Sequence, residues 1–351
     1  MCCGLPVQAD TLRIATYHTE LTRDGPGLLV RDIAKGKDAQ LLAMRQVVAE
    51  VAPDILLLQG VDYDHGLAGL TALQGWLAEG GVFYPHVFAA APNSGLPTGY
   101  DMDADGRLGE PEDAHGYGSF FGQSGMALLS KHPIDTDAIR DFSPALWVDV
   151  PDPLLPVHAD GTPFPSAQAQ AALRLATVGQ WMVPVRVDKT TVSVLAFHAG
   201  PPVFDGPEDR NGKRNHDELV FWQHYLDGVF GPAPKARFVL LGAANLDPVD
   251  GEGYHQAITG LLNDPRLQDP APRRPNGELA DSPGQSGDPE FDTVAWPVPD
   301  PGHRRADYVL PSADWQVVDA GVYWPKPQDP KADVVAEASR HRMVWVDLML
   351  P

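Results

Sequence analysis

The sequence is poor in cysteine and in basic residues, and both shortages argue against whole classes of protein. Its 351 residues include two cysteines, Cys2 and Cys3, which are adjacent and terminal, so an intrachain disulfide framework is not expected. Lys and Arg number 26 against 47 Asp and Glu, which gives a formal net charge of −21. Nucleic-acid affinity comes largely from basic groups that neutralise phosphates, so this balance argues against a nucleic-acid partner without excluding a local basic groove.

Several familiar signatures are also absent. No run of 18 apolar residues occurs, so no membrane-spanning helix is expected. There is no Gly-x-Ser-x-Gly nucleophile motif, and the glycines of "GLPTGYDMDADG" lack the lysine of a nucleotide-binding loop.

The first ten residues, "MCCGLPVQAD", allow two interpretations. Val7-Gln8-Ala9 resembles the end of a secretory signal, but too few residues precede it for a full apolar region. Residues 1–10 are therefore either a truncated leader or a frayed terminus. A leader, together with the acidic composition, predicts a periplasmic or secreted protein.

Apolar residues make up 43% of the chain, which is ample for a large core, and their spacing predicts secondary structure. Strands are predicted at 11–21, 54–60, 125–134, 181–187, 191–199, 236–242, 305–312, 315–324 and 342–350. Helices are predicted at 38–52, 67–80 and 215–230, the last with Asn215 or Asp217 as its N-cap. The short turn after residue 187 predicts a hairpin.

These elements predict an α/β fold with two mixed β-sheets packed face to face and helices on the outside. Strand and helix patterns run from end to end, so residues 11–351 are expected to form a single domain. Two stretches rich in Pro and Gly, 143–166 and 265–304, are interpreted as long surface excursions within it.

The most specific local signal is "DMDADGRLGEPE" (101–112), which fits D-x-D-x-D-G followed by five residues and Glu. Asp101, Asp103 and Asp105 offer carboxylates at alternate positions, Gly106 permits a sharp turn, and Glu112 is placed to close the shell with both oxygens. This pattern predicts a structural calcium loop. The alternative is a solvated acidic turn.

Seven segments carry a resemblance that covers nearly the whole chain. In order they are "TYHTE", "PDILLLQGVDYD", "SGMALLSKHPI", "FHAGPPVFDGPEDRNGKRNHDEL", "LLGAANLDP", "RADYVLPS" and "SRHRMVWVDL". From about residue 11 the sequence resembles the endonuclease/exonuclease/phosphatase superfamily, which has the DNase I-like four-layer sandwich. The resemblance implies a hydrolase that cleaves phosphoesters with magnesium, at a site built by loops at one end of the sheets.

Four positions match the family's motif residues. His198 matches the first catalytic histidine, and His341 matches the terminal histidine that contacts the scissile phosphate. Asn245 matches the asparagine of Gly-Asp-x-Asn, and Asp307 matches the aspartate of the penultimate strand. The resemblance therefore implies catalytic roles for these four residues.

Four other positions depart from that motif. His18 stands where the resemblance expects Asn, Gly60 where it expects the metal-binding Glu, and Ala243 where it expects the general base. Arg340 stands where it expects the Asp before the terminal histidine. Because magnesium usually takes one or two carboxylates, these departures argue against the usual magnesium-assisted attack by water.

Three interpretations of such a site stay open. His18, His198 and His341 with a carboxylate would suit zinc or another transition metal, such as manganese, better than magnesium, and a zinc-bound water attacks without a carboxylate base. Arg340 and the histidines would alternatively form a metal-free pocket for a small phosphorylated molecule or another anionic ligand. The third interpretation is a site without chemistry.

Two neighbouring stretches carry further candidate residues, each with a structural alternative. Asp62, Asp64 and His65 are placed to replace the missing ligand or to form a solvated loop. Arg210 and Arg214, in the polar stretch 204–218, are candidates for substrate binding or for anchoring the following helix.

The sequence thus supports two functions. The first is a divergent extracytoplasmic phosphoesterase with a non-standard metal site. The second is a catalytically inactive scaffold, a pseudoenzyme, with a calcium loop and an anion pocket. The substrate and the oligomeric state are left open.

Overall fold

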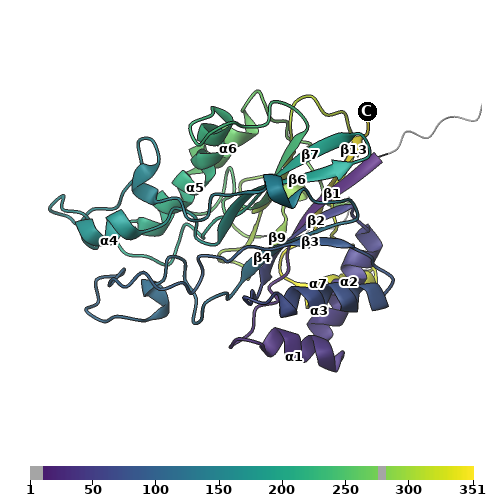
Figure 1. The fold of residues 1–351 in the computed structure, drawn as a ribbon, viewed down its shortest axis with the longest axis horizontal. Coiled ribbons are helices and arrows are strands. Elements are labelled where there is room, and N and C mark those ends of the chain that lie inside the picture. Colours follow the sequence, from purple (N-terminus) through teal and green to yellow (C-terminus); the bar gives the residue numbers. More distant parts are fainter. Residues whose placement is uncertain (1–10, 276–281) are drawn as a thin grey trace, which may run out of the picture.

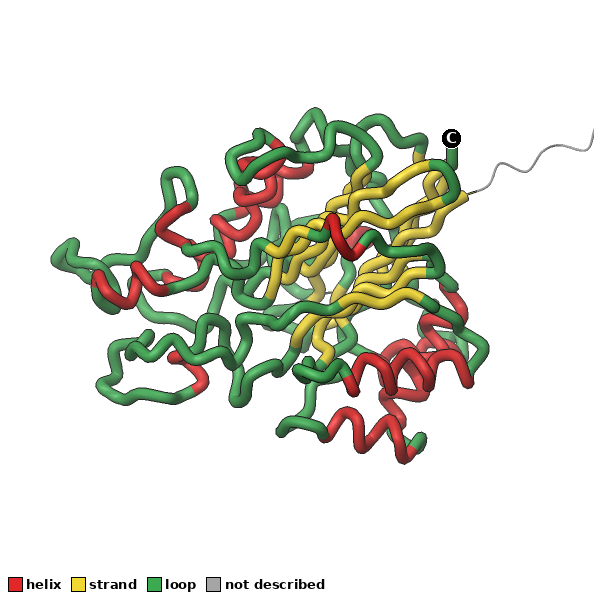
Figure 2. Tube along the Cα trace, viewed as in Figure 1, coloured by secondary structure: helices red, strands yellow, loops and turns green. Residues whose placement is uncertain are grey.

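The computed structural model describes residues 11–275 and 282–351, and its strands form two main sheets (Figures 1 and 2). Residues 1–10, with both cysteines and the leader-like segment, lie outside the described residues. Among the described residues, no helix combines the length and apolar character needed to cross a bilayer.

The first sheet has six strands in the order β12-β13-β1-β2-β4-β3. Its strands are β1 (Thr11–His18), β2 (Ile55–Val61), β3 (His86–Phe88), β4 (Gly125–Ser130), β12 (Val317–Val322) and β13 (Val344–Met349). β1 pairs parallel with β2 and antiparallel with β13, so the sheet is mixed.

The second sheet has five strands in the order β11-β8-β7-β6-β5. They are β5 (Arg140–Asp141), β6 (Gly179–Val187), β7 (Thr190–His198), β8 (Phe238–Ala243) and β11 (Asp307–Pro311). β6 and β7 form the expected hairpin, and β7 runs parallel to β8. β9 (Val294–Ala295) and β10 (His303–Arg304) form a small separate ladder.

Helices cover the outer faces of both sheets (Figure 1). They are α1 (Leu28–Lys35), α2 (Ala39–Val51), α3 (Ala68–Glu79), α4 (Ala167–Ala172), α5 (Arg210–Leu226), α6 (His255–Leu262) and α7 (Lys331–Ala338). Four single-turn 3₁₀ helices, Pro111–Asp113, Thr136–Ala138, Trp147–Asp149 and Pro289–Phe291, lie in the loops.

Three apolar clusters explain the layering. One lies between the sheets and joins residues of both, such as Ile14, Leu57, Val194 and Leu241. The second packs α1, α2, α3 and α7 on the first sheet, and the third packs α5 and α6 on the second. Because alternate residues of a strand point to opposite faces, both faces of each sheet are buried. The predicted fold class, two mixed sheets face to face with outer helices, is confirmed.

The differences from the predicted elements have simple reasons. α1, α4, α6 and α7 were not predicted, because six to eight residues are too few for a clear helical period. α5 begins at Arg210, so the prediction of Asn215 or Asp217 as its N-cap is wrong. Asn215 is instead fully buried inside the helix, where its amide donates to the carbonyls of Gly200 and Ala244.

Candidate active site

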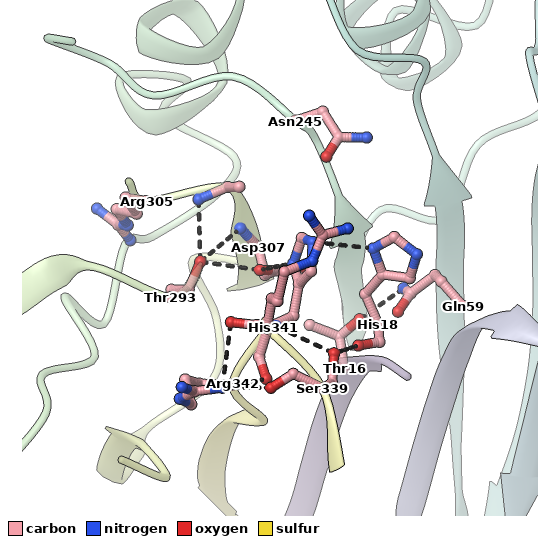
Figure 3. A network of polar contacts seen from close by, with 12 residues as sticks. Thr16, His18, Gln59, Asn245, Thr293, Arg305, Asp307, Ser339, His341 and Arg342 are labelled. Carbon is pink, nitrogen blue, oxygen red and sulfur yellow. Dashed lines mark hydrogen bonds and ion pairs between the residues drawn. The ribbon is translucent and has the colours of Figure 1, made fainter. Parts of the chain in front are cut away.

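Three histidines and an aspartate from both sheets lie close together, and Figure 3 shows His18, His341 and Asp307 among them. His18 ends β1, His198 ends β7, and Asp307 begins β11, while His341 precedes β13. The Nδ1 atom of His341 lies 2.8 Å from Oδ2 of Asp307, and its Nε2 atom lies 3.1 Å from Nδ1 of His18. The ring centroids of His198 and His18 are 4.7 Å apart. These four residues are called the histidine centre below.

The register of the second sheet positions half of this centre. Ala243 of β8 pairs with His198 on one side and with Asp307 on the other. Paired residues face the same side of a sheet, so the methyl group of Ala243 lies between the imidazole and the carboxylate. His198 Nδ1 and Asp307 Oδ1 are buried and have no hydrogen-bond partner among the described residues.

With both rings neutral, the two hydrogen bonds allow one arrangement of protons. An ionised Asp307 only accepts, so Nδ1–H of His341 donates to it. In a neutral His341, Nε2 is then an acceptor, and Nδ1–H of His18 donates to it. Burial, with a further contribution from the charge of Arg340, lowers the pKa of His18 well below its ordinary value, so that this ring is neutral. The Nε2 atom of His18 is left with a free lone pair.

Thr293 and Trp296 complete the surroundings of His341, and the sequence did not single them out. Thr293 donates its hydroxyl proton to Oδ2 of Asp307 (2.8 Å) and accepts the backbone N–H groups of Ala306 and Asp307. The Trp296 ring stands edge-on to His341, with centroids 5.7 Å apart. Both residues lie in the Pro-rich stretch 265–304, which gave no motif by which to recognise them.

Arg340 lies at the rim of the centre and is paired with a carboxylate. Its backbone N–H and its Nε each donate to Glu20 at 2.8 Å, and its Nη2 contacts the same group. Burial of Glu20 opposes ionisation, but the Arg340 contacts prevail and lower the pKa of its carboxyl. Asn245 also lies at the rim, with a positive φ of 52° and its amide donating to the carbonyl of Ala199 at 2.9 Å.

Arg210 and Arg214 contact other parts of the chain. The guanidinium of Arg214 is buried and donates to four backbone carbonyls, those of His115, Arg174, Leu175 and Ala176. Burial lowers its pKa to about 10. Arg210 donates to the carbonyl of Met102. Neither side chain has a hydrogen bond to the histidine centre within the described part of the chain, so the structure favours the anchoring alternative.

Asp62 and Asp64 also hold loops together. Asp62 accepts from Thr22 and from the backbone of Arg23 and Ser124. Asp64 accepts the N–H groups of Ala68 and Gly69 at the start of α3. These contacts match the loop alternative better than a replacement ligand set, and His65 follows in the same exposed turn.

The acidic loop, residues 101–112, lies apart on the segment between β3 and β4. One carboxylate oxygen each from Asp101, Asp103 and Asp105 lies within 4.8 Å of the other two. It is the one such group of three metal-ligating side chains among the described residues, and Glu112 is not part of it. The backbone N–H groups of residues 104–107 also point at these carboxylates.

A family assignment follows from comparison with known proteins. The family model described as the Endonuclease/Exonuclease/phosphatase family matches residues 31–341, most of the chain. This protein belongs to the endonuclease/exonuclease/phosphatase family. No curated protein matches its sequence.

Solved structures agree with the family fold. Sphingomyelinase C from Streptomyces griseocarneus is 17% identical, with a TM-score of 0.50, over 96% of this chain and 99% of that one. A mannosyl-6-phosphatase from Bacteroides thetaiotaomicron is 14% identical, with a TM-score of 0.50, over 97% and 100%. A mutant beta toxin from Staphylococcus aureus, solved with bound magnesium ions, is 14% identical, with a TM-score of 0.51, over 96% and 99%. At these identities the likeness shows the fold alone.

The donor set of the histidine centre does not fit magnesium. This cation takes oxygen ligands in near-octahedral geometry, usually with one or two carboxylates. Gly60 and Ala243 offer no side-chain ligand, and Oδ2 of Asp307 is engaged by His341 and Thr293. Oδ1 of Asp307 is then the one unengaged carboxylate oxygen that the four residues of the centre offer. The zinc interpretation has no support from the geometry either, because both nitrogens of His341 already make hydrogen bonds and the three imidazoles do not direct three free nitrogens at one point.

Proposed function

We propose that this chain hydrolyses a small phosphoester with His18 as general base and without a metal ion at the histidine centre. The observation that carries the proposal is the continuous chain of hydrogen bonds from Asp307 through His341 to His18. Such a chain orients an imidazole and stabilises the cation that forms when it takes a proton. Membership of the endonuclease/exonuclease/phosphatase family supports the substrate class.

In the proposed reaction a water molecule attacks the phosphorus atom. Its proton passes to Nε2 of His18 as the new O–P bond forms. The burial that lowers the pKa of His18 opposes the positive charge that develops on its ring, and the carboxylate of Asp307 offsets this by stabilising the charge through His341. The bond to the leaving group then breaks, and the departing oxygen takes a proton from solvent.

Asn245 and Arg340 are proposed to bind the phosphate oxygens. Both lie at the rim of the centre, and the Arg340 side chain is 58% exposed. The guanidinium already neutralises Glu20, which leaves little net positive charge at the rim. A singly charged phosphodiester therefore suits the site better than a doubly charged monoester.

The second candidate function is ligand binding without turnover. It is favoured by the low exposure of the centre, since His341 is 1% exposed and His198 is 6% exposed. In either case we propose that the acidic loop binds calcium as a structural ion, supported by the grouped oxygens of Asp101, Asp103 and Asp105. A periplasmic or secreted location is proposed from the acidic composition, and a nucleic-acid partner is not proposed.

The test is hydrolysis of bis(p-nitrophenyl) phosphate and p-nitrophenyl phosphate, in EDTA and with magnesium, manganese, zinc or calcium. We expect turnover in EDTA, reduced about a hundredfold or more by His18→Ala. His132→Ala is the matched control, because His132 follows β4 at the opposite end of the sheet. Turnover that requires a divalent cation and survives His18→Ala would contradict the proposal. No turnover under any condition would leave the binding function.

A further inference from the structure

Gly60 lies in β2 beside the histidine centre, at a point where the backbone leaves no room for a side chain. Its φ is +71°, in the left-handed region that other residues rarely adopt. A Cβ at this position would stand 2.9 Å from the backbone nitrogen of Glu20, 2.9 Å from Cδ2 of His18 and 3.0 Å from Nε2 of His18. These separations are too short for carbon contacts, so a side chain at residue 60 and the His18 ring exclude each other.

The His18 ring has little freedom to move aside. Its Nδ1 atom lies 3.1 Å from Nε2 of His341 (Figure 3), and its ring makes a T-shaped contact with that of His198. The hydroxyl of Ser339 donates a hydrogen bond to the backbone carbonyl of His18 at 2.7 Å. Turning the ring away from Gly60 would break its connection to Asp307.

We infer that His18 and Gly60 form a coupled pair that closes the place where the family resemblance puts a magnesium-binding carboxylate. The imidazole of His18 occupies the space that such a carboxylate would need. The absence of a side chain at Gly60 leaves room for that imidazole. This closure rests on the proposed function, because it gives a structural reason why the proposed hydrolysis would proceed without magnesium.

The rest of the centre is consistent with this closure. Ala243 is fully buried between His198 and Asp307 and adds no oxygen ligand. The oxygens of Glu20 are engaged by Arg340 and Ser339. A carboxylate restored at residue 60 alone would therefore clash with His18, and Oδ1 of Asp307 would be the one other unengaged carboxylate oxygen of the centre.

The coupling is tested by melting temperatures in a double-mutant cycle. The Tm is measured for Gly60→Ala, for His18→Ala and for the double variant. Gly36→Ala is measured as the control with and without His18→Ala. Gly36 is the matched control, since its φ is +61° but nothing lies within 4 Å of an added Cβ. Both substitutions place a side chain at a positive φ, and Gly60→Ala alone adds a clash.

We expect Gly60→Ala to lower the Tm more than Gly36→Ala does. In the His18→Ala background the loss should shrink, yet not vanish, because the backbone nitrogen of Glu20 remains in contact. The loss caused by Gly36→Ala should be equal in both backgrounds. An equal loss from Gly60→Ala with and without His18 would overturn the coupling.

Metal binding is the second readout, and it does not depend on activity. Mn²⁺ serves as the probe for a magnesium site and is titrated by electron paramagnetic resonance into Asp103→Asn, which removes the acidic loop as a competing site. We expect no bound Mn²⁺ in this parent. Addition of His18→Asn, Gly60→Glu and Ala243→Asp together should create one binding site.

Mn²⁺ bound by the parent and lost on Asp307→Asn would overturn the inference. The two proposals can fail separately. A protein that hydrolyses no phosphoester but shows the coupling and excludes Mn²⁺ refutes the proposed function alone, whereas metal-dependent turnover with bound Mn²⁺ refutes both.

Discussion

The histidine centre and the acidic loop are built in opposite ways. The centre gathers residues 18, 198, 307 and 341 from both sheets, and hydrogen bonds join Asp307, His341 and His18. The loop gathers three carboxylates within five residues and leaves them near the surface, bonded to their own backbone. When a candidate site is made of contiguous residues, the kind of ligand it suits can be predicted from the sequence. A site assembled by sheet register has properties that only packing reveals.

The largest effect is expected when Asp307 of the histidine centre becomes Asn. The amide can donate to His341, which reverses the proton arrangement along the chain to His18. Turnover of bis(p-nitrophenyl) phosphate should fall by about 10²–10⁴-fold. Steady-state kinetics measure the loss.

Asp319→Asn is the matched control for this change, because Asp319 lies exposed on β12 and accepts a hydrogen bond from the neighbouring backbone N–H of Ala320. It should keep the activity of the unsubstituted protein. Circular dichroism shows whether Asp307→Asn remains folded. A folded Asp307→Asn protein with undiminished turnover would mean that the hydrogen-bond chain has no part in catalysis.

The same contrast explains what could be predicted from the sequence. The sheets and long helices followed from apolar periodicity, and the motif order placed His18, His198, Asp307 and His341 at one end. Each of these is a local pattern, or a set of local patterns in a fixed order.

What the sequence did not predict depends on contacts between distant segments. The partnership of Glu20 with Arg340 joins residues 320 positions apart. The exclusion of a side chain at Gly60 comes from the His18 ring, and the burial of Arg214 comes from carbonyls of residues 115 and 174–176. No pattern of spacing or composition encodes these distances.

A smaller effect is expected in the pH dependence of stability, where the buried centre again differs from exposed groups. Burial, with a contribution from His341, lowers the pKa of His198 to about 3. Its unfolded value is about 6.5. Between about pH 3 and about pH 6.5 the unfolded chain binds one more proton at His198 than the folded chain does. The contribution of His198 to the free energy of unfolding is therefore complete above about pH 6.5. That contribution falls by about 1.4 kcal/mol per unit as the pH drops toward 3.

His198→Gln removes this titration, so the unsubstituted protein should lose stability more steeply than the variant from pH 7 to pH 5. Urea unfolding at each pH measures the difference. The buried Glu218, whose pKa burial raises to about 7, stabilises the fold as the pH falls. It acts equally in both proteins and cancels. Parallel curves for the two proteins would contradict a neutral, buried His198.

The smallest effect is expected at the acidic loop, and it separates the loop from the centre. A cation that binds only the folded state at ten times its dissociation constant stabilises by about 1.4 kcal/mol. Addition of calcium after EDTA should therefore raise the Tm by a few degrees, measured by differential scanning calorimetry. Asp103→Asn removes one of the three grouped oxygens and should abolish most of that rise. Asp160→Asn, in an exposed loop elsewhere, should retain it.

Turnover in EDTA should be the same in all three proteins, because the loop has no hydrogen bond to the centre among the described residues. A calcium response that persists in Asp103→Asn would place the ion elsewhere, and a loss of turnover in that variant would show that the two regions are coupled.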